Sequence, residues 1–141
     1  MAVPEYVTPN DVKGYLDDTI IVQLTDDAGT GEIDESVLAE VCGRANREVD
    51  GYVSTRYAVL SQPPQILRDL ALDVAIYHLH SRRFVAPDNI ADRYKEALRK
   101  LREISEGRLE IGLAHKVSRQ TRAGKVSGTE RNFDPESMKV M

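Results

Sequence analysis

The sequence predicts a mainly α-helical protein: a four- to five-helix bundle-like domain followed by an extended C-terminal arm. Over most of residues 34–104, apolar residues recur at intervals of three and four, the period of an amphipathic helix. Capping residues and prolines mark where several of these helices begin and end. After Gly107 this period is lost and polar residues dominate. We therefore predict a helical domain over residues 1–107 and an arm over residues 108–141.

At 141 residues, the chain is long enough for one domain with a single core and no disulfide bonds. Its one cysteine, Cys42, falls on an apolar helix face, so we expect a small buried hydrophobe rather than a reactive thiol. The N-terminus has no basic segment followed by an apolar run, and no stretch approaches the ~20 apolar residues of a membrane span. We expect cytoplasmic synthesis and no membrane insertion.

Charge is divided unevenly along the chain. Residues 1–106 contain 12 Lys or Arg against 19 Asp or Glu, a net charge of −7, whereas residues 107–141 contain 7 against 4, a net charge of +3. An acidic body argues against a surface that neutralises nucleic-acid phosphates. The basic arm could contact nucleic acid or an acidic protein, and its small excess of charge favours the protein.

The first helix is predicted to begin at Thr8, a capping residue followed by Pro9 at the first helical position and by Asp11 as the acidic member of a capping box. It should run to about Leu16. Residues 20–24 are a brief apolar run that fits either a second short helix or a strand, and we favour the helix.

The third predicted helix begins at Asp34 and has a continuous apolar face. Gly51 lies inside it at a cost of about 1 kcal/mol relative to alanine, which predicts close approach of another backbone or side chain. Asp50 could serve as a catalytic base, but we expect it to form a structural ion pair with Arg56, Arg82 or Arg83. The pair of Asp50 with Arg56 would set the angle to the next helix.

Pro63 and Pro64 end this segment, and a fourth helix is predicted from Gln65 to about Phe84. Its apolar residues lie on nearly every side, so it must be covered either at the centre of the domain or by a neighbouring subunit as well. This pattern is a first indication of an oligomer. A fifth helix should follow Pro87 and end at a left-handed cap on Gly107.

The arm has too little apolar surface to fold alone, so we expect it to lie on a partner. Residues 109–113 alternate as in a short strand, and residues 117–126 are compatible with a short β-hairpin around Gly124. The residues expected to contact the partner are Leu109, Ile111, Leu113, Arg119, Arg122, Lys125, Arg131, Phe133 and Met138.

Tests for chemistry give no catalytic, metal or cofactor site. A calcium loop starting at Asp26 would place Val37 where a bidentate glutamate is required. His78 and His80, two residues apart on a helix, point about 200 degrees apart and cannot share one ion without a third element. Gly124 and Lys125 resemble the end of a phosphate-binding loop, but the serine or threonine that should follow is missing.

Four segments in order carry a family resemblance. They are Tyr6-x-Thr8-x-x-Asp11-Val12, Ala45-x-x-x-Val49-Asp50-x-Tyr52-x-x-x-Arg56-Tyr57, Leu70-x-x-Asp73-Val74-Ala75-x-Tyr77-x-Leu79, and Tyr94-x-x-Ala97-Leu98-x-x-Leu101-x-x-Ile104-x-x-Gly107. Together they resemble the Mu-like bacteriophage head proteins of the neck region, over about three quarters of the chain. The resemblance implies a head-tail connector, or adaptor: a small helical protein that forms a ring, typically of twelve copies, beneath the portal.

That resemblance also implies the partners: other copies in the ring, the portal protein, and the next neck or tail-completion protein. Packaged DNA would pass through the channel without sequence-specific binding, and the protein would reside in the virion. Two other functions remain open. One is a small helical nucleic-acid-binding or regulatory protein whose basic tail contacts phosphates. The other is an enzyme that uses Asp50 or Asp73 with a histidine.

Overall fold

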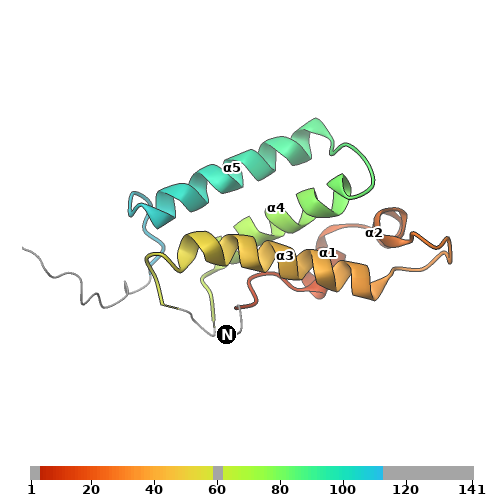
Figure 1. The fold of residues 1–141 in the computed structure, drawn as a ribbon, viewed down its shortest axis with the longest axis horizontal. Helices are drawn as coiled ribbons and strands as arrows, with labels where there is room; N and C mark the ends of the chain where they lie inside the picture. The colour runs from red at the N-terminus through yellow and green to blue at the C-terminus, as the bar shows by residue number, and fades with distance from the viewer. Residues whose placement is uncertain (1–3, 59–61, 113–141) are drawn as a thin grey trace, which may run out of the picture.

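The computed structural model describes residues 4–58 and 62–112, and these contain five α-helices. Two short helices, α1 (Pro9–Tyr15) and α2 (Asp18–Thr25), precede three long ones, α3 (Glu35–Val53), α4 (Gln65–Ser81) and α5 (Asp88–Ser105). The long helices lie side by side, with α4 antiparallel to α3 and α5, and the short helices pack near one end of this bundle (Figure 1). The mainly helical, bundle-like fold is confirmed.

Local signals in the sequence place the helix ends. The amide of Asp11 donates to the Thr8 side chain and the amide of Thr8 donates to the Asp11 carboxylate, which completes the predicted capping box. Asp34 caps α3 by accepting from the amides of Ser36 and Val37. Gly107 has a φ of +81° and ends α5 as predicted. The run at residues 20–24 is helical, as favoured.

The core gathers apolar side chains from all five helices around α4, which contacts α1, α2, α3 and α5. This arrangement covers the apolar surface of α4 within a single chain. The apolar character of this helix is therefore explained within one chain, so the helix pattern gives no evidence about an oligomer, which stays a prediction. Cys42 is buried in this core, and burial raises the pKa of its thiol to about 11.

Gly51 is not where two segments approach each other. It lies on the exposed face of α3, and no heavy atom of the described chain is within 4 Å of the position that a Cβ atom would take. The prediction of a close approach at this glycine was wrong for the described residues. The apolar period of α3 already places Gly51 away from the buried face, a signal that the prediction did not use.

The first residues after α5 belong to the helical body. Ile111 is buried in the core with 9% exposure, and Leu109 packs against the same core. In the described chain, residues 109–112 form no strand. The other predicted arm contacts, and the hairpin at 117–126, lie outside the described residues: Leu113, Arg119, Arg122, Lys125, Arg131, Phe133 and Met138.

Candidate interaction surface

The loop between α2 and α3 is held in shape by its own carboxylate. Asp26 accepts hydrogen bonds from the backbone amides of Thr30 at 2.8 Å and Gly31 at 2.7 Å, and these bonds lower the pKa of its carboxyl group. Gly29 and Gly31 have positive φ angles, which other residues rarely adopt. Asp26 thus acts as the cap of a tight loop.

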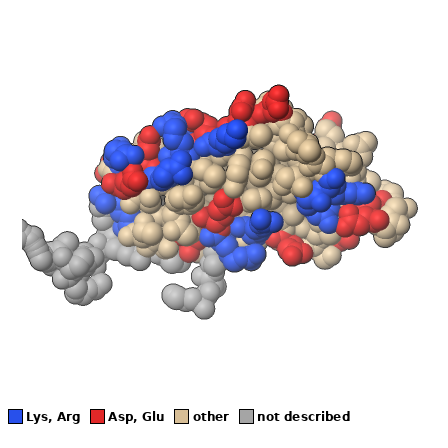
Figure 2. Space-filling view, turned by 45° about the horizontal axis from the view of Figure 1, so that its top comes forward, with Lys and Arg blue, Asp and Glu red and all other residues tan. Residues whose placement is uncertain are grey.

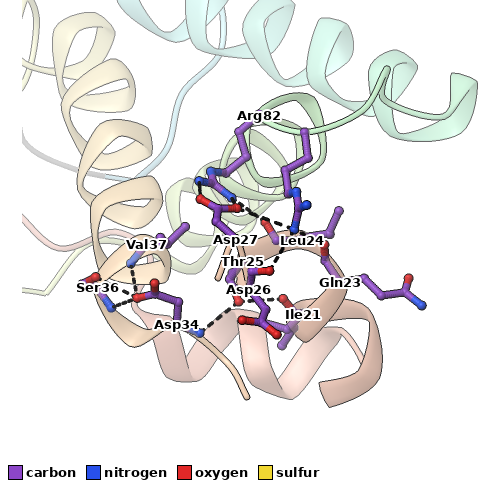
Figure 3. Close-up of polar contacts among 11 residues, drawn as sticks. Ile21, Gln23, Leu24, Thr25, Asp26, Asp27, Asp34, Ser36, Val37 and Arg82 are labelled. Carbon is purple, nitrogen blue, oxygen red and sulfur yellow. Dashed lines mark hydrogen bonds and ion pairs between the residues drawn. The ribbon is translucent and has the colours of Figure 1, made fainter. Parts of the chain in front are cut away.

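Thr25 joins the two ends of this loop. Its side chain is fully buried, and its hydroxyl donates to the Ile21 carbonyl at 2.9 Å while accepting from the Asp34 amide at 3.0 Å (Figure 3). Because Asp34 is also the cap of α3, the hydroxyl connects the last turn of α2 to the first turn of α3. The corner between these helices is therefore fixed at both of its ends.

Two arginines at the end of α4 reach the same corner. Arg82 donates to the Leu24 carbonyl at 2.7 Å and to both carboxylate oxygens of Asp27, the shorter at 2.6 Å (Figure 3). This hydrogen-bonded pair lowers the pKa of the Asp27 carboxyl group. Arg83 donates to the carbonyls of Gln23 and Asp26. These bonds satisfy backbone groups at the carboxyl end of α2, where a cation is favoured by the helix dipole.

A surface pocket of about 270 Å³ opens beside this corner, between α3 and α4. It is rich in cationic side chains and carries one carboxylate, and its lining is Val37, Glu40, Val41, Arg44, Arg47, His78 and Arg82. Arg44 and Arg47 are exposed, and neither side chain has a hydrogen bond or ion pair with another described residue. In the sequence they look like ordinary polar-face residues of α3.

His78, which is 7% exposed, connects this pocket to the interior. Its Nε2 atom lies 2.7 Å from a carboxylate oxygen of Glu48, and the other oxygen accepts from the Tyr94 hydroxyl at 2.8 Å. Tyr94 stacks on Tyr77 with ring centroids 4.0 Å apart. One carboxylate on α3 thereby holds a histidine of α4 and a tyrosine of α5, so His78 has a structural partner. In the described residues, no group of three or more His, Cys, Asp or Glu side chains could hold a metal ion.

The structure does not bring Asp50 and Arg56 into an ion pair. The Asp50 carboxylate accepts from the Tyr6 hydroxyl at 2.9 Å instead, while the Arg56 guanidinium lies against Gly107. Arg82 and Arg83, the alternative partners, both pair with Asp27. Asp50 therefore anchors the N-terminal segment to α3 and does not set the angle to the next helix through Arg56.

Asn46 is the residue of this anchor that sequence analysis missed. It is 6% exposed, and its side-chain oxygen accepts from the amides of Tyr6 and Val7 at 3.0 and 2.9 Å, while its nitrogen donates to the Val7 carbonyl at 3.1 Å. The signal was present, since position 46 follows Cys42 by four residues and precedes Val49 by three, which places a polar amide on the apolar face of α3.

In a comparison with known protein families, residues 6–129 match the family described as Bacteriophage Mu, Gp36. This range includes the whole helical body and extends beyond it into the C-terminal segment. No protein in the curated set is significantly similar to the chain. Among the described helices, none is long and apolar enough to cross a membrane.

Proposed function

The chain belongs to the Bacteriophage Mu Gp36 family, and from this premise we propose that it is a structural, non-enzymatic connector protein of the phage neck. In this role identical copies form a ring below the portal and link the DNA-filled head to the tail. Its partners are the other copies, the portal protein and the next neck or tail-completion protein, and it resides in the virion. The observation that carries the proposal is the family match over most of the chain.

The polar contacts of the body support a structural role over an enzymatic one. Asp50 is held by the Tyr6 hydroxyl, and Asp73 is held by Arg93, whose Nη2 atom lies 2.9 Å away. His78 is held by Glu48. Asp50, Asp73 and His78 therefore each form a contact that ties one segment of the body to another, whereas His80 has no side-chain partner among the described residues. The three contacts are accounted for by the stability of the fold.

The negative net charge of the helical body supports passage of DNA through a ring of copies without tight binding. Residues 1–106 have a net charge of −7, so a ring of such bodies would repel a phosphate backbone at short range. The face drawn in Figure 2 carries Lys and Arg in separate groups interspersed with Asp and Glu, and it presents no continuous basic surface. A polyanion finds no extended track on that face.

The proposal is tested by mixing the purified protein with the portal protein of its phage and imaging the product by electron microscopy. We expect a ring of this protein attached to one end of the portal. A chain ending at Gly112 should keep the folded body, because it retains the buried Ile111, and should lose attachment. Unchanged attachment of this truncated chain would exclude a docking role for residues 113–141, and absence of any ring would contradict the connector proposal.

The nucleic-acid alternative rests on the basic segment, since residues 113–141 contain six Lys or Arg against three Asp or Glu. It predicts binding of duplex DNA with an affinity that falls steeply as salt concentration rises. Titrating fluorescent duplex DNA with the full chain and with the chain ending at Gly112, at physiological ionic strength, distinguishes the two functions. Salt-dependent binding by the full chain alone would favour the alternative.

A further inference from the structure

The pocket between α3 and α4 is lined by three arginine side chains, of which one has partners in the described chain and two do not. Arg82 is committed, because it already binds Asp27 and the Leu24 carbonyl. Arg44 and Arg47 are not committed to any described residue. They lie three residues apart on α3, so they occupy neighbouring positions on one helix face beside the same pocket. Two uncommitted guanidinium groups next to a third create a local concentration of positive charge in an acidic body.

The chemistry of the lining fits a carboxylate. Guanidinium groups bind carboxylates through paired hydrogen bonds, and these charge-assisted bonds are stronger than neutral ones. Val37 and Val41 supply an apolar wall for the methylene groups of an aspartate or glutamate side chain. The volume of about 270 Å³ is below the roughly 300–1,000 Å³ of pockets that enclose drug-sized ligands, so one or two side chains fit better than a nucleotide.

The surroundings favour a peptide over a nucleic acid. Glu40 lines the pocket itself, Glu48 lies behind His78, and Asp27 lies beside Arg82. A phosphodiester chain that placed one phosphate in the pocket would bring its neighbouring phosphates near these carboxylates. A polypeptide can insert a single carboxylate and keep its other groups neutral. The confined basic charge therefore suits one or two acidic side chains.

Two occupants from within the protein fit less well. The C-terminal segment at residues 113–141 is basic, so its net charge has the wrong sign. Of the 20 carboxylates in the described body, 13 already have a partner, in helix caps, in the α2–α3 loop, in ion pairs or in bonds to neighbouring side chains. The other seven are exposed on the folded body, and binding by a second copy is the outcome that the self-association measurement below distinguishes. We propose that the pocket at Arg44 and Arg47 is a docking site for an acidic segment of a different protein, which inserts an aspartate or glutamate carboxylate between them.

The test is an NMR titration of the full chain with a capped peptide that carries two adjacent glutamates flanked by glycine and alanine residues. We expect shifts of the Arg44 and Arg47 side-chain N–H signals and of the backbone signals of Val41 and His78. The same peptide with glutamine in place of both glutamates should cause none. The double variant Arg44→Gln/Arg47→Gln should bind the glutamate peptide at least about tenfold more weakly, because it loses charge-assisted hydrogen bonds.

The matched control is Arg68→Gln/Arg102→Gln, which removes the same charge from two exposed arginines that do not line this pocket and have no side-chain partner among the described residues. It should bind the glutamate peptide with the affinity of the parent chain. Equal weakening in both double variants would reduce the effect to net charge and overturn the proposal. So would tighter binding of inorganic phosphate or duplex DNA at Arg44 and Arg47, or self-association of the protein that depends on these two residues. The proposal does not require the connector role, and the two can fail separately.

Discussion

The guanidinium group of Arg56 lies so close to Gly107 that a Cβ atom on this glycine would be 2.6 Å from the Arg56 Cζ atom. Gly107 also has a φ of +81°, and the amides of Gly107 and Arg108 donate to the carbonyls of Ile104 and Glu103, which is the hydrogen-bond pattern of a Schellman cap. Glycine thus meets two demands, a left-handed backbone and space for the arginine. The cation in turn lies at the carboxyl end of α5, where the helix dipole favours it.

Replacing Gly107 with alanine should lower the free energy of unfolding by more than about 1 kcal/mol, because alanine is strained at a positive φ and its methyl group would displace Arg56. Urea denaturation measures this loss. In an Arg56→Ala background the steric part disappears, so Gly107→Ala should cost less there than in the parent chain. An equal cost in both backgrounds would show that the contact with Arg56 contributes nothing.

Replacing Gly51 with alanine should have the opposite effect on stability. It has helical neighbours on both sides and open space around its Cβ position, so Gly51→Ala should raise the free energy of unfolding by about 0.5–1 kcal/mol. The measurement is again urea denaturation, with Gly107→Ala as the contrasting variant. A loss of stability would mean that a contact absent from the described residues occupies this face of α3.

Asn46 is expected to be the most sensitive polar residue of the body. Asn46→Ala would leave the amides of Tyr6 and Val7 and the Val7 carbonyl without this partner, at about 1–3 kcal/mol for a buried unsatisfied group. Tyr6→Phe is the milder comparison, since it removes only the hydroxyl bonded to Asp50 and should cost about 1 kcal/mol. Hydrogen exchange should show faster exchange at Tyr6 and Val7 in Asn46→Ala. Unchanged exchange there would contradict the anchoring role.

Stability should fall in acid because of the α2–α3 corner. The pKa values of Asp26 and Asp27 lie below the ordinary 3.8, the first through amide hydrogen bonds and the second through Arg82. The unfolded chain therefore binds more protons in acid, so this contribution is present above pH 3.8 and is lost as pH falls through the lowered values. Asp26→Asn should make the urea midpoint decline less steeply below about pH 4.

The control is Asp18→Asn, at a carboxylate with no described partner, which should leave the decline as steep as in the parent chain. If both variants showed the same slope, the contribution of Asp26 would be excluded.

The helices were predictable because their ends depend on neighbouring residues. Thr8, Asp34 and Gly107 each form the cap that their sequence context indicates, and an apolar period of three to four shows which face is buried. The fourth helix was harder to interpret, since a helix that is apolar on most sides fits both the centre of a fold and a subunit interface. Only the positions of the other four helices show that it lies at the centre of the fold.

The polar contacts were less predictable because they join segments far apart in the chain. Asp50 had arginines nearby in sequence, but its partner Tyr6 is 44 residues away. The pocket at Arg44 exists because Arg82, on another helix, is brought beside α3 by its contacts with α2. No local sequence pattern predicts a contact between residues so far apart in the chain. An asparagine on an apolar helix face, such as Asn46, is a local signal that could have been used.

The burial of Ile111 has a mechanical consequence. Any tension applied to the chain from its C-terminal side reaches Ile111 before it reaches α5, since Ile111 and Leu109 follow that helix and are seated in or against the core. The apolar contacts of these two side chains with the core would be stretched first, and the Arg56–Gly107 contact would be stretched next. These contacts would therefore break before α5 begins to unwind.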